Sequence, residues 1–243
     1  MTGAVDWIKP ERLAQRALDE SGDVNANGDF GSYAKANLNG TLEGSGIESH
    51  NLVFAEGRVE LYRQLWRGLP LDSIADMGCG LGLTAGALAD AFPNARVDGY
   101  ELSPDAVSFA RRRFPKANFE CRAIGRDNDL GRRFDLILCQ EFYPFTRTSD
   151  LDTHAEFLTV LRHHLTDHGC LIIELSERDF GTSILCNLER LSGFRIERTV
   201  MPFDRVFRYL PFLPLAQFAS FFLGRATRMA RNIHLKLTPL KGH

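Results

Sequence analysis

The sequence predicts an α/β fold in which helices cover both faces of a mostly parallel sheet. Short β-like runs alternate with helical patterns between residues 73 and 202. A glycine-rich turn joins the first of these runs to the helix that follows it. The chain has 243 residues, 44% of them apolar and 25% charged, which is typical of one large globular domain with appendages.

Each element is predicted from its local pattern. Residues 52–69 have apolar side chains at helical spacing, which predicts an amphipathic helix. Ser103 is a typical N-cap, and Pro104 a typical first-turn residue, for a helix over residues 103–114. The other predicted helices cover residues 10–20, 83–91, 151–165 and 182–191. The predicted strands cover residues 73–77, 95–102, 118–124, 134–140, 170–175, 194–202 and 232–237.

Three regions differ in composition. Residues 1–50 combine a short predicted helix with a loop rich in Gly, Asn and Ser, which is either a lid or a mobile N-terminal segment. Residues 51–200 contain the alternating strands and helices and form the predicted core domain. Residues 201–243 hold an apolar, basic insert and the last predicted strand.

Charge is distributed unevenly along the chain. The formal net charge is only −2, which disfavours a nucleic-acid-binding protein that relies on bulk positive charge, so no nucleic-acid partner is expected. Residues 201–243 have seven basic side chains and one acidic one, a net charge of +6, so residues 1–200 carry −8. A basic tail on an acidic body predicts an anionic partner for the tail.

The five cysteines are odd in number, lack CxxC spacing and mostly lie in apolar runs. This pattern predicts reduced core thiols and a cytoplasmic protein. Residues 1–11 lack the apolar segment of a secretory signal. No group of His, Cys and carboxylate residues has zinc-like spacing in the sequence, so no metal is expected.

The strongest signal is the turn from Asp76 to Gly82, which reads D-x-G-x-G-x-G. Glycine permits positive φ and the close approach of a ligand, and the following helix offers free N–H groups at its N-terminus. Such a turn holds the polar part of a nucleotide-like ligand. Leu83 stands where the dinucleotide fingerprint has its third glycine, which disfavours a nicotinamide-dependent enzyme. Glu101 ends the second predicted strand, where a carboxylate can accept hydrogen bonds from both ribose hydroxyls.

This turn resembles motif I of the class I S-adenosylmethionine-dependent methyltransferases. Residues 134–139 and 169–173 are similar to the fourth and fifth strands of that family. The resemblance spans roughly residues 70–200. It implies a Rossmann-like, seven-stranded sheet in the order 3-2-1-4-5-7-6 with an antiparallel last strand, and S-adenosylmethionine as the cofactor. The residues that it assigns to cofactor binding are Asp76, Gly78, Gly80, Gly82, Glu101, Leu102, Ile124 and Gln140.

The resemblance also implies a role for each of these residues. Asp76 would contact the methionyl amino group, Glu101 would hold the ribose, and Leu102 would pack against adenine. The three glycines would line the methionyl and ribose portions. No acidic residue ends the third predicted strand, where Ala123 and Ile124 lie, so adenine recognition is expected to rest on backbone and apolar contacts.

Methyl transfer requires alignment of the acceptor with the methyl group and, for many acceptors, removal of a proton. Glu141 and Tyr143, after the fourth predicted strand, are candidates for this chemistry. So are His50, at the end of the glycine-rich loop, and His154, early in the next helix. Each has a structural alternative: a loop-fixing carboxylate, a packing ring, or a surface or hydrogen-bonded histidine. The segment 141–145 lacks the [DNS]-P-P-[YF] motif of amino-group methyltransferases, which disfavours that class.

Residues 205–231 form an unusual insert. Residues 210–223 carry no charge but are too few to span a bilayer, which needs about 20 residues. Apolar residues at helical spacing followed by arginines are typical of a helix at an anionic membrane interface. The alternative is a helix packed over the active site or against a second copy in a homodimer.

Together these patterns predict methyl transfer from S-adenosylmethionine to a small-molecule acceptor, an oxygen of a sugar or of a lipid-linked glycan. The alternatives are a protein or RNA methyltransferase, a nicotinamide-dependent oxidoreductase, and a non-catalytic S-adenosylmethionine-binding subunit. The expected location is the cytoplasm, or the inner face of the membrane if residues 205–231 contact lipid.

Overall fold

The computed structural model describes most of the predicted core domain. The ranges described are residues 47–66, 70–125, 129–146, 150–176, 187–188, 190–191, 193–201, 215, 218–219 and 232–240. The predicted helix and loop of residues 10–46 lie outside these ranges, as does most of the segment 205–231. The lid, membrane and homodimer therefore stay predictions.

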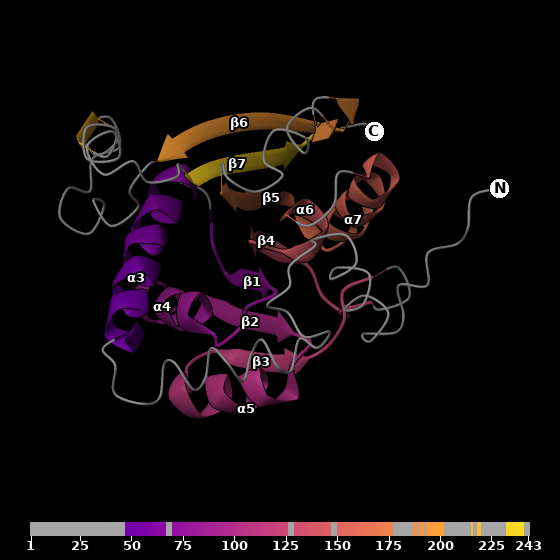
Figure 1. Ribbon diagram of the computed structural model, residues 1–243. Coiled ribbons are helices and arrows are strands. Elements are labelled where there is room, and N and C mark those ends of the chain that lie inside the picture. The colour runs from indigo at the N-terminus through magenta and orange to yellow at the C-terminus, as the bar shows by residue number, and fades with distance from the viewer. Residues whose placement is uncertain are drawn as a thin grey trace.

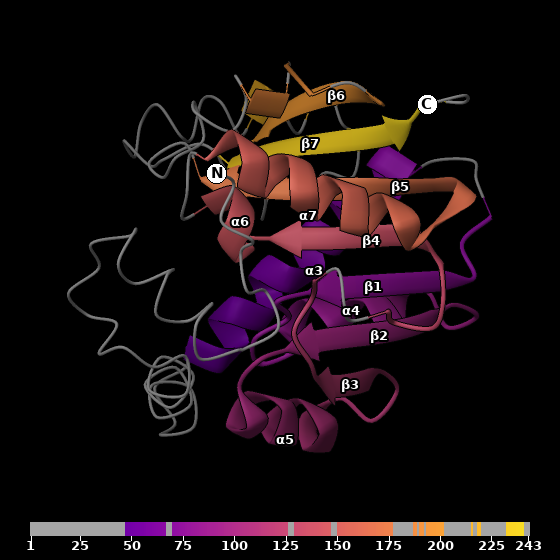
Figure 2. The same cartoon turned by 90° about the vertical axis from the view of Figure 1, so that its right-hand side faces the viewer.

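Seven strands form one mixed sheet in the order β3-β2-β1-β4-β5-β7-β6, as the resemblance implied. All pairs from β3 to β5 are parallel, and β7 runs antiparallel to both β5 and β6. Figure 2 shows β7 pointing opposite to β2 and β4. The strands are β1 (Ser73–Met77), β2 (Arg96–Glu101), β3 (Asn118–Cys121), β4 (Phe134–Gln140), β5 (Leu165–Ser176), β6 (Phe194–Met201) and β7 (Asn232–Pro239).

Helices cover both faces of this sheet (Figures 1 and 2). They are α3 (Ile47–Trp66), α4 (Leu83–Ala91), α5 (Pro104–Arg113), α6 (Tyr143–Thr146) and α7 (Leu151–His163). Alternate strand residues point to opposite faces, which divides the buried apolar side chains into two clusters. One cluster joins the sheet to α3, α4 and α5, and the other joins it to α6 and α7.

Several element boundaries differ from the predicted ones. Helix α3 begins at Ile47, so His50 lies inside a helix and not at the end of a loop. Strand β3 ends at Cys121, so Ile124 follows the strand and does not end it. Strand β5 begins earlier than predicted, with a register irregularity against β4, and the sequence pattern did not predict the short helix α6.

The prediction of buried thiols is right for Cys139 and Cys170, which are buried free cysteines. Cys79 is half-buried in the glycine turn. The prediction is wrong for Cys121, which is exposed because it is the last residue of the edge strand β3.

A buried carboxylate fixes the amino ends of the central strands. Asp135, at the start of β4, accepts hydrogen bonds from the backbone N–H groups of Asp72 (2.9 Å) and Ser73 (3.0 Å). It also accepts one from the Thr166 hydroxyl (2.8 Å) and lies 2.9 Å from Nε2 of His168. Burial acts to raise the pKa of Asp135, but these hydrogen bonds outweigh it and lower the pKa. The carboxylate thus ties β1, β4 and β5 together at the edge opposite the glycine turn.

Candidate cofactor site

The glycine turn lies where β1 ends and α4 begins. Gly78, Gly80 and Gly82 have φ angles of 71°, 53° and 76°, which glycine adopts without the strain of a side chain. The backbone N–H groups of Gly78 and Cys79 donate hydrogen bonds of 2.8 and 3.0 Å to the carbonyl oxygen of Tyr100. The turn is therefore anchored to the carboxyl end of β2.

The three glycines meet different surroundings. A Cβ atom at Gly82 would lie 2.7 Å from the Phe119 ring and 2.8 Å from Cβ of Ala110, so Gly82 permits close packing against β3 and α5. A Cβ atom at Gly78 would lie 3.0 Å from the Phe142 ring. A Cβ atom at Gly80 would meet no described residue within 4 Å. Among the described residues, none fills the space beside Gly80.

Asp76, the last residue but one of β1, is a buried acid with an unmet acceptor. Its side chain is 2% exposed, and its Oδ2 has no hydrogen-bond partner among the described residues. Burial, followed by the charge of Glu101, raises the pKa of Asp76 to about 7, although the N–H of Ala85 acts to lower it. The charged form of a buried carboxyl group is stabilised by a cationic donor. The methionyl ammonium group of S-adenosylmethionine is such a donor.

Glu101, at the end of β2, connects the turn to the next loop. Its Oε2 accepts a 2.9 Å hydrogen bond from the N–H of Gly80, and its Oε1 accepts bonds of 2.7 and 3.0 Å from those of Leu102 and Ser103. A carboxylate has about four acceptor sites, which leaves about one for a ligand. Glu101 is thus placed to accept a hydrogen bond from one ribose hydroxyl. The predicted contact to two hydroxyls would need two unoccupied acceptor sites, and about one remains.

The residues predicted to meet adenine lie next to Glu101. The N–H of Arg122 donates a 2.9 Å hydrogen bond to the carbonyl oxygen of Glu101, which brings the segment after β3 to the end of β2. Ile124, which is 6% exposed, belongs to the apolar cluster on the α7 face, and Leu102 packs against that cluster. Leu102 and Ile124 thus place apolar side chains near the end of β2, and their contact with adenine stays a prediction.

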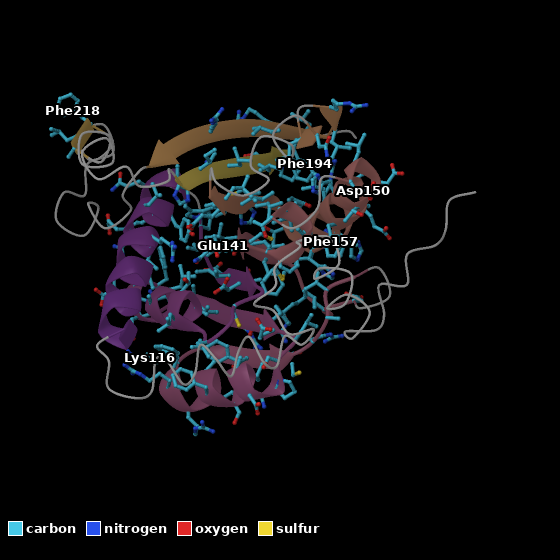
Figure 3. The ribbon with its side chains drawn as sticks, in the orientation of Figure 1. Lys116, Glu141, Asp150, Phe157, Phe194 and Phe218 are labelled. Carbon is cyan, nitrogen blue, oxygen red and sulfur yellow. The ribbon has the colours of Figure 1, made fainter. Side chains whose placement is uncertain are left out.

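Gln140 and Glu141 lie at the carboxyl end of β4. The Thr84 hydroxyl donates a 2.9 Å hydrogen bond to Oε1 of Gln140, which turns the amide N–H₂ group of Gln140 away from α4. Glu141 is exposed and has a φ of 46°, a left-handed conformation that costs a non-glycine residue free energy. Its N–H donates to the Glu174 carbonyl (3.2 Å), and its own carbonyl accepts from the Thr146 hydroxyl (3.2 Å). Figure 3 labels Glu141 in a view along which it overlaps the middle of the molecule.

Of the other three catalytic candidates, His154 is the one whose side chain the structure describes. His154 is 0% exposed, its Nδ1 lies 3.1 Å from Nδ2 of Asn187, and its ring packs 5.9 Å from that of Phe145. The phase of α7 turns His154 into the core, which favours the alternative of a buried, hydrogen-bonded histidine. His50 lies in α3 and Tyr143 begins α6, but both side chains are outside the described part of the structure.

Sequence reasoning missed a buried polar cluster beside the turn. Glu174 on β5 is 2% exposed and accepts hydrogen bonds from Nε of Arg58 (2.9 Å) and from the Tyr62 hydroxyl (2.8 Å), both on α3. The charges of Arg58 and Glu174 both act on the pKa of Asp76. The sequence carries a signal for this cluster, because a glutamate interrupts the apolar run of a strand predicted to be buried.

Comparison with known proteins shows what this core is similar to. Residues 74–169 match a protein family described as a methyltransferase domain. A dTDP-3-amino-3,6-dideoxy-α-D-glucopyranose N,N-dimethyltransferase of Streptomyces fradiae is 35% identical over 105 residues, 42% of this chain and 38% of its own. A trans-aconitate 2-methyltransferase of Azoarcus sp. is 31% identical over 127 residues, 51% of this chain and 48% of its own. The chain thus spans less than half the length of these curated relatives.

Solved structures share the fold over most of the chain. The plantazolicin methyltransferase BpumL, in complex with a desmethyl substrate analogue and S-adenosylhomocysteine, has a TM-score of 0.56 at 18% identity, covering 96% of this chain and 97% of its own. A TehB-like methyltransferase of Corynebacterium glutamicum has a TM-score of 0.54 at 21% identity, covering 86% and 97%. The family match over residues 74–169, the D-x-G-x-G-x-G turn and the strand order 3-2-1-4-5-7-6 together show that this chain has the fold of the class I S-adenosylmethionine-dependent methyltransferases.

Proposed function

We propose that this protein transfers a methyl group from S-adenosylmethionine to a hydroxyl oxygen of a small, sugar-like acceptor. The observation that carries the cofactor assignment is the buried carboxylate of Asp76, whose Oδ2 has no partner among the described residues. When bound, S-adenosylmethionine supplies an electrophilic methyl group on a positively charged sulfur. The chain supplies the groups that hold it and the acceptor.

Five side chains would hold the cofactor together with the glycine turn. Asp76 pairs with the methionyl ammonium group, and Arg58 pairs with the methionyl carboxylate. Glu101 accepts a hydrogen bond from a ribose hydroxyl through Oε2, which keeps one acceptor site beyond Gly80. Leu102 and Ile124 form the apolar surface for adenine.

Glu141 is the proposed general base. It is exposed at the carboxyl end of β4, and its strained backbone conformation is typical of functional positions. A hydroxyl acceptor must lose a proton as the new bond forms, and Glu141 can take that proton. The carboxylates of Asp76, Glu101 and Glu141 together would repel an anionic acceptor, which supports a neutral one. The amide N–H₂ of Gln140, oriented by Thr84, can donate to the acceptor oxygen.

A second acceptor is supported by one comparison. The Streptomyces fradiae relative is named for N,N-dimethylation of an amino sugar, so the amino group of a sugar is the alternative to a hydroxyl group. An RNA acceptor has weaker support. A tRNA adenine methyltransferase of Porphyromonas gingivalis is 35% identical to this chain over 135 residues. Residues 141–145 of this chain, however, lack the amino-methylation motif.

The experiment offers the protein S-adenosylmethionine with paired, phosphate-free glycosides that differ only in a hydroxyl or an amino group. Mass spectrometry detects the gain of one methyl group, and the hydroxyl member is expected to react. Glu141→Gln should lower kcat by about 10²–10⁴-fold while cofactor affinity is unchanged. Glu197→Gln, an exposed carboxylate on β6, is the matched control and should retain full activity.

Two outcomes would change the proposal. Full activity of Glu141→Gln would remove Glu141 as the base. Binding of S-adenosylmethionine without turnover of any sugar, peptide or RNA acceptor would favour a non-catalytic binding subunit.

The proposal also includes a location at or near the inner face of a membrane. No helix among the described residues is long and apolar enough to cross a membrane. Leu215 and Phe218, in the segment 205–231, are 52% and 71% exposed (Figure 3 labels Phe218). Co-sedimentation with anionic liposomes tests lipid contact, and analytical ultracentrifugation tests the homodimer. A protein that stays in the supernatant with the liposomes at low salt would rule out the lipid contact. A protein that sediments as a monomer would rule out the homodimer.

A further inference from the structure

Glu174 occupies an unusual position in the sheet. It lies near the carboxyl end of β5, beside Gln140 of β4 and His234 of β7 in the strand register. Its side chain is 2% exposed and faces α3. A buried carboxylate is strongly destabilising unless it is paired and hydrogen-bonded. Its partners therefore determine what this residue does.

The partners of Glu174 come from one face of α3. Arg58 and Tyr62 are four residues apart, so their side chains lie on the same side of the helix. Nε of Arg58 donates to Oε1 at 2.9 Å, and the Tyr62 hydroxyl donates to Oε2 at 2.8 Å. Nδ1 of His234, which is 0% exposed, lies 3.8 Å from Oε2. Each oxygen of Glu174 thus fixes a different side chain of the same helix.

The same residue also reaches the cofactor site. Its carbonyl oxygen accepts the hydrogen bond from the N–H of Glu141, the strained residue after β4. Arg58, which Glu174 holds, is 16% exposed and lies close enough to Asp76 for its charge to lower the pKa of that acid. Glu174 therefore connects α3, the end of β4 and the acid at the end of β1.

We propose that Glu174 is a positioning residue that sets the cofactor specificity of the site by fixing Arg58. Glu174 does not touch the cofactor. It holds the guanidinium of Arg58 at the methionyl end of the site, with Tyr62 fixing the second oxygen, so that the carboxylate of the methionyl group is recognised there. This inference rests on the proposed function, because it assumes that S-adenosylmethionine binds at the glycine turn.

The test compares two ligands that differ only in that carboxylate: S-adenosylmethionine and decarboxylated S-adenosylmethionine. Calorimetry measures the dissociation constant of each for the full-length protein and its variants. The wild-type protein is expected to prefer the intact ligand by about 10-fold or more, since a hydrogen bond to a charged group is made with only one of them. Glu174→Gln keeps the size of the side chain but removes its charge, and should reduce this preference to about threefold or less.

Further variants separate positioning from general stability. Arg58→Met should abolish the preference, and adding Glu174→Gln to it should change nothing more, because the two residues act as one unit. Tyr62→Phe, which removes only one hydrogen bond to Glu174, should weaken the preference partially. If Glu174→Gln does not fold, as judged by circular dichroism, Arg58→Met and Tyr62→Phe still decide the question.

The outcomes are distinguishable. Equal loss of affinity for both ligands in these variants, with the preference intact, would show a purely structural cluster and overturn the inference while leaving the proposed function in place. A wild-type protein that binds neither S-adenosylmethionine nor S-adenosylhomocysteine would overturn the proposed function itself.

Discussion

The backbone N–H of Gly80 donates a 2.9 Å hydrogen bond to the carboxylate of Glu101, which joins the glycine turn after β1 to the end of β2. The same carboxylate accepts two more backbone hydrogen bonds, from Leu102 and Ser103. Glu101 thus holds the shape of the turn through the protein's own backbone groups, and the ribose contact is an additional role. Mutations of this residue should affect both the protein and its ligand.

Glu101→Ala is expected to weaken S-adenosylhomocysteine binding by about 10-fold or more, because one charged hydrogen bond contributes about 1.5–3 kcal/mol. It should also lower the melting temperature of the protein without ligand, since three backbone N–H groups lose their acceptor. Calorimetry and thermal unfolding measure the two effects. Glu120→Ala, on the neighbouring strand β3 and with a side chain that is 42% exposed, is the control and should change neither. Unchanged affinity in Glu101→Ala would refute the ribose assignment.

Alanine variants of Gly80 and Gly131 separate the effect of the glycine turn on cofactor binding from its effect on stability. Both glycines have positive φ angles, 53° and 67°, and a Cβ atom at either would lie more than 4 Å from the other residues that the structure describes. Alanine at each position should therefore cost about 1–2 kcal/mol of stability from backbone strain. Only Gly80→Ala should reduce cofactor affinity, because Gly131 lies outside the site. Equal ligand affinity in the two variants, measured by calorimetry, would place the cofactor elsewhere.

Asp76 makes cofactor binding depend on pH. Its pKa is raised to about 7 by burial and by Glu101, so the acid is largely neutral below pH 7 and charged above it. Only the charged form pairs with an ammonium group, so affinity for S-adenosylhomocysteine should rise as the pH increases through 7. The rise should level off about one pH unit above 7, where Asp76 is almost fully charged. Asp76→Asn should flatten the profile, and a wild-type profile without this rise would contradict the pairing.

Asp135 makes the stability of the fold depend on pH in the acidic range. Its pKa in the folded protein is lower than the value of 3.8 expected without the fold. The stabilisation is therefore fully present above about pH 4 and is lost as the pH falls through the folded pKa. Asp135→Asn should lose about 1.5–3 kcal/mol at pH 7, and the difference from wild type should shrink towards pH 3. Denaturant unfolding at both pH values checks this, and a difference that grows on acidification would be inconsistent with it.

Much of the fold is predictable because its signals are local. β1, α4 and β4 have the predicted bounds, since each is bordered by clear turn residues or caps. The strand order came from the resemblance to a family and not from any local pattern. The glycine turn and Glu101 are adjacent in the structure as predicted, because the carboxyl ends of neighbouring parallel strands meet at one edge.

The buried pairing of Arg58 with Glu174 could not be predicted from local sequence patterns. Arg58 and Glu174 are 116 residues apart, so no window of sequence contains both. The burial of His154, by contrast, could have been predicted from the sequence. His154 shares the buried face of α7 with Phe157, Leu158 and Leu161, which recur at helical spacing. A histidine on the apolar face of a helix is better read as part of the core than as a base.

The most direct test of the account is titration calorimetry of the wild-type protein with S-adenosylhomocysteine, NAD and NADP. One equivalent of S-adenosylhomocysteine should bind, and at 100 times its dissociation constant it should stabilise the fold by about 2.7 kcal/mol. Neither nicotinamide nucleotide should bind, because Leu83 replaces the glycine that their fingerprint requires. Binding of NAD or NADP without S-adenosylhomocysteine would contradict the central claim and assign the glycine turn to a different reaction.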